Sequence, residues 1–376
     1  MDLKIASFSA DSSNFTITLT NEGADASGKF TVYYVMDEIY LADPDYTYAT
    51  ISDIPGRQST SFAIPNQLTS SDGKGGHCVT AYADYNSEVE ETNEGNNKKY
   101  AYYYDGSYSS AYSNINSKYS TWKETLRSKV QSDYGWSASG SYNTHLVDTI
   151  TSESGSSSAG LMSRRMLYGS STSTPVVLLN LKSASDGYSN YGYQDSWHTY
   201  NSSQEVIYHE YTHAFHYEHV KKTGGSSVWS DLADWFIEGL AVYTAGQGED
   251  RVKYYAYTLK KNSGYTESQA LEEILEAVDG ASTVDSNDYA GNFLAIDYIV
   301  NTFGLAALKN IINDSAAGTS LNTAIVNNLS NVSSITSFRS KVRTYATTYL
   351  DTYWAGLDTP TAAAVSSPRV FLDERD

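Results

Sequence analysis

Several features are scarce in this sequence, and each absence excludes a class of protein. Only one cysteine, Cys78, is present, so no intramolecular disulfide scaffold is available. Aliphatic runs reach about four residues, as at 176–179, whereas a membrane-spanning helix needs roughly 20. Lysine and arginine total 25 against 44 acidic residues, and the net charge of −19 repels a phosphate backbone. A membrane-spanning protein and a nucleic-acid-binding protein are therefore not expected.

The residues that are abundant indicate a folded chain. Hydrophobic residues make up 40% of the 376 residues, and 34 of the residues are tyrosine, which leaves enough apolar mass for packed cores. At roughly 100–200 residues per domain the length predicts two domains or more. The first residues lack a charged n-region and an apolar h-region, so any signal peptide has been removed or was never present.

Residues 1–104 have the pattern of an all-β domain. Phe15, Ile17 and Leu19 alternate with threonines, which is the period of two expected of a half-buried strand. The predicted strands are 3–8, 14–20, 29–36, 59–64 and 78–85, and Cys78 is expected to be a small buried core residue.

Three features of this segment resemble the CARDB family of adhesin-type modules. They are the opening Asp2-Leu3-Lys4-Ile5, the Asn21-Glu22-Gly23 turn and the acidic Val89-to-Asn97 stretch VEETNEGNN after a strand. The resemblance implies an immunoglobulin-like sandwich that holds or spaces another domain. Any other small sandwich with an acidic hairpin loop remains the alternative.

The periodicity changes after a tyrosine-rich boundary at 100–106. Helical spacing begins near Ser117, where Trp122, Leu126 and Val130 recur, while 151–160 is expected to be an exposed loop. A buried strand is predicted at 175–181, with the ability to bind peptide by edge addition. Residues 105–357 are assigned to a second domain with a poorly assigned lead-in at 106–175, and 358–376 to a linker or tail. The predicted helices are 204–222, 231–245, 251–260, 268–278 and 289–303.

The motif His209-Glu210-Tyr211-Thr212-His213 lies inside the helix predicted at 204–222. Residues four apart share a helix face, so both imidazoles can reach one metal ion. Glu210 follows the first histidine, where a carboxylate can act as base toward a metal-bound water. The motif therefore predicts a zinc site with Glu210 as a catalytic residue.

Two residues compete for the position of third ligand. His219 has the spacing found in metzincins, but His216 stands where that pattern has glycine, and all four methionines lie upstream of the motif instead of in a downstream turn. The other candidate is Glu238, in the predicted helix 231–245, where Gly239 is small enough to let two helices approach closely. We therefore expect His209, His213 and Glu238 to bind the metal.

The pair of motifs His209-Glu210-x-x-His213 and Trp235-x-x-Glu238-Gly239-x-Ala241 resembles the gluzincin superfamily of zinc metallopeptidases. This resemblance implies an α+β, mostly helical peptidase domain behind the all-β sandwich, in a multidomain protein. The Gly-x-Met-Glu-Asn segment of aminopeptidase N-type members is missing, which argues against aminopeptidase activity.

A tetrahedral oxyanion formed during hydrolysis needs a donor besides zinc. Tyr289 is the first candidate, because a phenol donates without adding charge, although a core tyrosine would fit the same pattern. His198 is the second candidate. His216 and His219 are expected near the end of the motif helix, where its dipole would favour a cationic imidazole, and not among the ligands.

The pattern as a whole predicts a secreted or surface-associated zinc metalloendopeptidase acting on a protein or peptide. The sandwich would contact a cell surface or a glycan. Two alternatives stay open: a surface adhesin or pseudo-peptidase, and a zinc hydrolase of glycopeptides that stacks sugars on the aromatic stretch 188–197.

Overall fold

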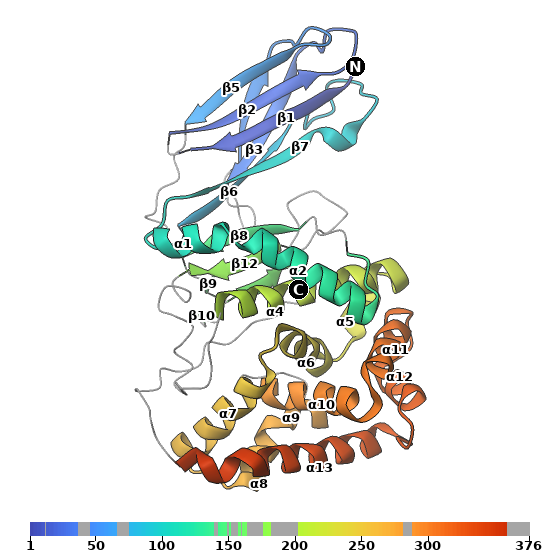
Figure 1. The fold of residues 1–376 in the computed structure, drawn as a ribbon. Helices are drawn as coiled ribbons and strands as arrows, with labels where there is room; N and C mark the ends of the chain where they lie inside the picture. Colours follow the sequence, from blue (N-terminus) through green and yellow to red (C-terminus); the bar gives the residue numbers. More distant parts are fainter. Residues whose placement is uncertain are drawn as a thin grey trace.

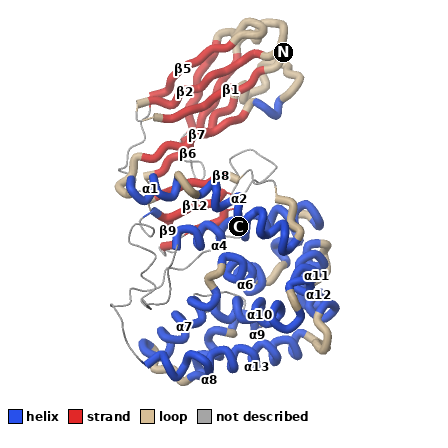
Figure 2. The backbone as a smooth tube through the Cα atoms, in the orientation of Figure 1, coloured by secondary structure: helices blue, strands red, loops and turns tan. Residues whose placement is uncertain are grey.

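The computed structural model places a β-rich part at one end of the molecule and a helical part at the other (Figures 1 and 2). Two hydrophobic cores are formed, one from residues between Leu3 and Val89 and one from residues between Ile115 and Leu357. None of the described helices is both long enough and apolar enough to cross a bilayer. The structure describes residues 1–11, 13–36, 46–65, 75–138, 142–148, 150–151, 157–158, 160–163, 176–181, 202–280 and 288–358.

The N-terminal part consists of two antiparallel sheets that face each other across the first core. Phe15, Ile17 and Leu19 are buried on one sheet, and Phe30 and Val32 are buried on the other. The alternation of threonine and apolar residues in 14–21 thus predicts correctly which side chains face inward. One sheet has the order β1-β2-β5 and the other has β4-β3-β6-β7. The bounds are β1 Leu3–Ala10, β2 Asn14–Asn21, β3 Phe30–Met36, β4 Tyr46–Ile51, β5 Ser59–Pro65, β6 Gly76–Tyr82 and β7 Lys98–Tyr104.

Two strands of this domain are absent from the sequence prediction. The strand β4 was not expected, and the tyrosine-rich stretch that was predicted as a boundary is instead β7, paired with β6 along its length. Tyrosine favours strands, but a run of tyrosines has no apolar–polar alternation by which to recognise one. A short 3-10 helix, Glu94–Asn96, precedes β7. The side chain of Cys78 lies outside the described part of the structure.

The two parts of the molecule meet where the ends of β6 and β7 reach the strand β8 (Asn143–Val147). The Tyr102 hydroxyl donates to the Leu146 carbonyl, and the Tyr104 hydroxyl donates to Asp148. A Cβ at Gly76 would lie 2.2 Å from the Leu146 carbonyl oxygen, so only glycine fits this contact.

A small sheet opens the second part. Its order is β11-β12-β8, with β12 (Val176–Asn180) parallel to β8 and antiparallel to β11 (Gly160–Ser163). The predicted strand at 175–181 is therefore confirmed, but its predicted use for edge addition is wrong, because β12 is central and pairs on both sides. The expected loop at 151–160 also contains short strands, Ile150–Thr151 (β9) and Ser157–Ser158 (β10), which pair with each other.

Helices form most of the second part of the chain that the structure describes. The helix α6 lies between α4 and α10, and it is buried along nearly its whole length (Figure 1). The helix predicted at 231–245 corresponds to α6, which begins after Ala233, a residue that provides no side-chain cap, and a separate short helix, α5, ends at Asp231. The helix predicted at 268–278 is divided into α8 and α9.

The bounds of the helices are α1 Ser109–Asn116, α2 Tyr119–Tyr134, α4 Ser202–Gly224, α5 Ser226–Asp231, α6 Asp234–Ala245, α7 Gly248–Asn262, α8 Glu267–Ile274, α9 Glu276–Asp279, α10 Asp288–Phe303, α11 Leu305–Ala316, α12 Leu321–Asn328 and α13 Ile335–Trp354. A 3-10 turn, Ala355–Asp358, follows α13.

Candidate metal centre

The helix α4 carries the His209-to-His213 motif in the core of the second part. Its ends agree with the sequence prediction, since it begins at Ser202 and ends at Gly224. His209, Glu210 and His213 are all buried, with at most 4% of each residue exposed. The two imidazoles lie one turn apart with ring centroids 4.7 Å from each other, as the spacing of four residues requires.

Glu238 reaches this pair from α6. Its neighbour Gly239 permits a close helix contact, but with α10 and not with the motif helix: a Cβ at Gly239 would lie 2.4 Å from the Asn292 carbonyl oxygen. The absence of a side chain lets α6 rest directly on the backbone of α10. Glu238 itself is 3% exposed, so α6 presents a carboxylate to the core with almost no solvent around it.

The three predicted ligands converge. His209 Nε2 lies 3.2 Å from Glu238 Oε2, and His213 Nε2 lies 3.4 Å from Glu238 Oε1. The two Nε2 atoms are 3.0 Å apart. Side chains from two helices therefore direct two imidazole nitrogens and one carboxylate toward a single point.

Gln247 determines which nitrogen of His209 carries the proton. Its Oε1 atom lies 3.0 Å from His209 Nδ1, and a carbonyl oxygen only accepts, so Nδ1 is the donor. Burial lowers the pKa of His209 to about 4 against the opposing attraction of Glu238, so the ring is neutral at pH 7. The Nε2 lone pair of His209 therefore faces Glu238.

The Glu238 carboxyl is ionised despite its burial. Burial by itself would raise its pKa, but the charge of His213 beside it outweighs burial and holds the pKa well below its usual range. Among the described residues no donor forms a hydrogen bond to Glu238 Oε2, although this atom is buried. A negative oxygen and a nitrogen lone pair thus face each other at 3.2 Å.

This donor set fits a divalent cation. Two acceptor atoms at such a distance repel each other unless positive charge lies between them, and two imidazoles with one carboxylate are a common metal ligand set. The chemistry of the side chains accordingly suits a divalent metal ion. The ligand set leaves a fourth coordination position for water or substrate.

Tyr289 and Arg251 lie beside this group. The Tyr289 ring centroid is 6.1 Å from that of His209, and the tyrosine is 2% exposed. The Arg251 guanidinium carbon lies 5.4 Å from the Tyr289 ring centroid. Burial, followed by the charge of Glu238, raises the pKa of Tyr289 well above its usual value, so its hydroxyl keeps its proton. The alternative donor His198 and the aromatic stretch 188–197 lie outside the described residues.

His216 and His219 lie in a different environment. The His216 ring stacks on Trp136 with centroids 5.1 Å apart and meets Trp229 edge-on. His219 Nε2 lies 3.2 Å from Asn313 Oδ1, and burial lowers the pKa of His219. The burial of His219 thus opposes the cationic imidazole that the helix dipole would favour.

A second group of carboxylates lies in the N-terminal part. Asp84, Glu91 and Glu94 have oxygens close enough to hold a cation. Asp84 accepts from the backbone N–H of Glu88 and Val89, and Glu91 accepts from the N–H of Leu3 and from Asn97. The bond from Leu3 connects Glu91 to β1, and the bonds to Asp84 stabilise the loop that precedes Glu91. These carboxylates therefore have a structural role in the sandwich.

Sequence reasoning missed Gln247 and Arg251. Both lie at the start of α7, directly after α6, and neither belongs to a motif. Gln247 is the N-cap residue of α7, and α7 is rich in charged residues, so no local pattern distinguishes these two positions in the sequence.

Comparisons with known proteins assign the N-terminal part. The CARDB family model matches residues 3–101, so this segment is a CARDB domain. No curated protein matches the chain.

The solved structures that are similar include domains of archaeal proteins. A domain of a provisionally named cell surface protein from Methanosarcina acetivorans is 22% identical over 27% of this chain and 90% of its own, with a TM-score of 0.22. The CARDB domain of a Pyrococcus furiosus protein, in complex with di-metal ions, is 15% identical over 28% of this chain and 86% of its own, with a TM-score of 0.22. A β-glucosidase from Kluyveromyces marxianus is 14% identical over 28% of this chain and 15% of its own, with a TM-score of 0.17.

Proposed function

We propose that residues 105–357 form a zinc metalloendopeptidase of the gluzincin type, and that the chain is secreted or held at a cell surface. The observation that carries the proposal is the convergence of His209 Nε2, His213 Nε2 and the Glu238 carboxylate within 3.4 Å of one another. The CARDB domain supports a location outside the cell, since the resemblance to adhesin modules implies a holding or spacing role.

His209, His213 and Glu238 would hold the metal. Bound Zn²⁺ would polarise the scissile carbonyl and lower the pKa of a water molecule in its open position. Gln247 orients the first of these ligands by accepting from Nδ1, so that Nε2 is presented with its lone pair.

Glu210 is the residue that moves the proton. It follows His209 on α4 and is 2% exposed, so its carboxylate acts in a site with little competing water. A carboxylate there takes the proton of the attacking water and transfers it to the leaving amine. Removal of such a general base costs about 10²- to 10⁴-fold in rate.

Tyr289 is the proposed donor to the oxyanion. Its raised pKa keeps the phenol protonated, and its ring lies next to that of His209. A neutral donor stabilises developing negative charge without opposing the positive charge of a metal.

The test is a comparison of Glu210→Gln with Glu238→Ala and with wild type. We expect Glu210→Gln to keep about one zinc per chain while casein hydrolysis falls about 10²-fold or more. Glu238→Ala should lose most of its zinc, and a chelator should abolish wild-type cleavage. Glu218→Gln is the matched control, because it lies on α4 and pairs with Lys222 instead of facing the metal centre.

Two results would contradict the proposal. One is hydrolysis by Glu210→Gln at the wild-type rate. The other is wild-type protein that takes up no zinc when zinc is supplied in excess.

A surface adhesin whose peptidase-like part is inactive is the second candidate, and the CARDB match favours it. In that case zinc would be bound, no peptide would be cleaved, and attachment to a surface ligand would survive Glu210→Gln unchanged. The same set of variants therefore separates the two functions.

A further inference from the structure

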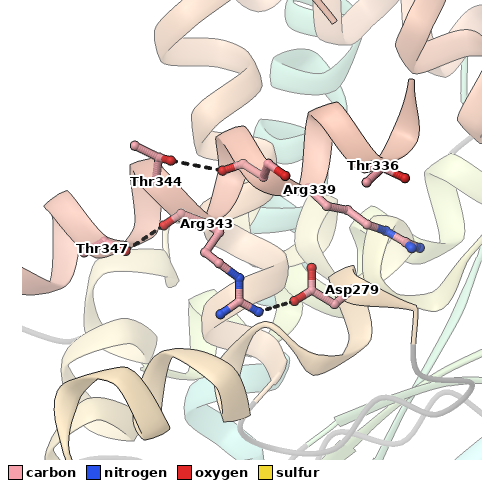
Figure 3. Close-up of a pocket in the computed structure, with 7 residues that line it drawn as sticks. Asp279, Thr336, Arg339, Arg343, Thr344 and Thr347 are labelled. Atoms are coloured by element: carbon pink, nitrogen blue, oxygen red, sulfur yellow. Dashed lines mark hydrogen bonds and ion pairs between the residues drawn. The ribbon is translucent and has the colours of Figure 1, made fainter. Parts of the chain in front are cut away.

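A polar pocket lies along α13 and shares no residue with the candidate metal centre (Figure 3). Its volume is about 410 Å³, which is within the range of sites for small molecules. One face of α13 supplies two arginines and four hydroxyl side chains, and the end of α9 supplies Asp279. The pocket thus offers a positive group, a negative group and hydroxyls together.

The two arginines have different surroundings. Arg343 forms an ion pair with Asp279. The Arg343 side chain is 39% exposed and the Asp279 side chain is 34% exposed, so this ion pair lies at the surface. Within the described part of the chain, Arg339 forms no ion pair, and its buried Nε atom makes no hydrogen bond. In the view of Figure 3 the two guanidinium groups lie on opposite sides of the Asp279 carboxylate.

The Arg339 guanidinium is held in place by packing. It rests on Gly280, where a Cβ would lie 3.0 Å from Nη2 and 3.4 Å from Cζ. Gly280 ends α9 with a φ of +117°, a conformation that favours glycine. Among the described residues the Arg339 guanidinium has no ion-pair partner, since Asp279 pairs with Arg343. Such a group is available for an anion from outside the chain.

Asp279 restricts which anion fits. A bare ion such as phosphate can bind the arginines but offers little to the Asp279 carboxylate, whereas a molecule that carries both an acid and hydroxyl groups can also donate to Asp279 and to the hydroxyl side chains. The geometry points to an acidic sugar as the ligand, with its carboxylate on Arg339 and its hydroxyls on Asp279 and the side chains of Ser340 and Thr336. The inference does not rest on the metal centre.

The experiment is a titration of the full chain as purified, at constant ionic strength, followed by calorimetry or by NMR. The probe is D-glucuronate, and the reference ligands are D-glucose, which lacks the acid, and inorganic phosphate, which lacks the hydroxylated body. We expect saturable binding of glucuronate, at least tenfold tighter than either reference. A second titration with a polymer of uronic acid shows whether the site takes a free sugar acid or a sugar acid within a polysaccharide.

Variants locate the site. Arg339→Gln should weaken glucuronate binding about ten- to a hundredfold, as expected for a charge-assisted hydrogen bond. Arg339→Lys keeps the charge but loses the planar fork, so its loss should be intermediate. Arg127→Gln on α2 removes the same charge at a side chain that pairs with Glu124, and it should bind like wild type.

Three results would overturn the inference. They are no saturable binding of glucuronate, equal affinities for wild type and Arg339→Gln, and equal losses in Arg339→Gln and Arg127→Gln. Phosphate binding as tight as glucuronate binding would also overturn it, since this would show a simple anion site. Circular dichroism of each variant confirms that it has folded.

Discussion

Gln247 is the residue whose role is clearest from geometry and least visible in the sequence. It accepts from His209 Nδ1 at 3.0 Å, although 38 positions separate the two residues. It is 2% exposed, so water cannot easily replace it. A group of this kind orients a metal-binding imidazole and determines its tautomer.

Gln247→Leu should therefore weaken zinc binding about 10- to 100-fold, the usual effect of losing a partner behind a metal ligand. Competition with a chromophoric chelator measures the affinity. Gln247→Glu keeps a hydrogen-bond acceptor at this position, so it should retain most of the wild-type zinc affinity. A purely structural defect at this position would lower the affinity in both variants. Gln131→Leu, at an exposed position on α2, is the control. An unchanged affinity in Gln247→Leu would show that the contact does not orient His209.

At the scale of elements, the close approach of α6 to α10 positions Glu238. The backbone of α10 occupies the space that a side chain at Gly239 would need, with the Asn292 carbonyl oxygen 2.4 Å from the position of a Cβ. The two helices must separate if a methyl group is added there.

Gly239→Ala should therefore destabilise the chain by about 1–3 kcal/mol, even though alanine favours an open helix by about 1 kcal/mol. It should also weaken zinc binding, because Glu238 moves with α6. Urea denaturation and a zinc titration measure the two effects. Gly356→Ala is the control, since no atom lies within 4 Å of a Cβ there. A Gly239→Ala variant as stable as wild type would contradict the packing described.

The first turn of α4 contains a carboxyl group with a perturbed titration. Burial, and then the charge of Asp250 on α7, raises the pKa of Glu205 to about 8 against the opposing charge of Arg251. A raised pKa means that the folded state binds this proton more tightly than the unfolded chain does. The associated stability is fully present below the usual carboxyl pKa and is lost as pH rises through about 8.

Glu205→Gln should therefore flatten the fall in stability between pH 5 and pH 9, and it should be more stable than wild type at the upper end. Thermal unfolding at a series of pH values measures this. Glu272→Gln, at an exposed position on α8, should follow the wild-type curve. Parallel curves for Glu205→Gln and wild type would show that Glu205 does not titrate in this range.

At the scale of the whole molecule, two separate hydrophobic cores predict two unfolding units. Leu19 is fully buried in the core of the N-terminal sheets, and Ile296 is fully buried among the helices. Tyr102 and Tyr104 of β7 pack against the second core and donate hydrogen bonds to Leu146 and Asp148, but no buried residue belongs to both cores. Weak coupling is expected across a contact of this kind.

Leu19→Ala should lower the midpoint temperature of one calorimetric transition, and Ile296→Ala should lower the midpoint temperature of the other. Each substitution should cost about 2–5 kcal/mol in its own part, as for other large apolar residues removed from a core. Differential scanning calorimetry measures both transitions. A single transition that shifts in both variants would show that the two parts unfold together.

Local patterns in the sequence were sufficient for the elements whose geometry repeats along the chain. The alternation in 14–21, the histidine spacing on α4 and the buried strand at 176–180 all agree with the structure. The reason is that a helix and a strand satisfy their backbone hydrogen bonds with fixed periods, so side chains at those periods share a face. The CARDB resemblance of the first residues agrees with the family match for the same reason, since its motifs are short and contiguous.

Tertiary structure alone decided the relations between distant segments. It placed Gln247 behind His209, α10 under Gly239 and β12 in the middle of its sheet. It also made a strand of the tyrosine-rich stretch 98–104, because pairing with β6 stabilises a sequence that has no alternation of its own. These relations depend on which surfaces pack together, and packing is selected by the fit of the whole chain and not by the period of any one segment.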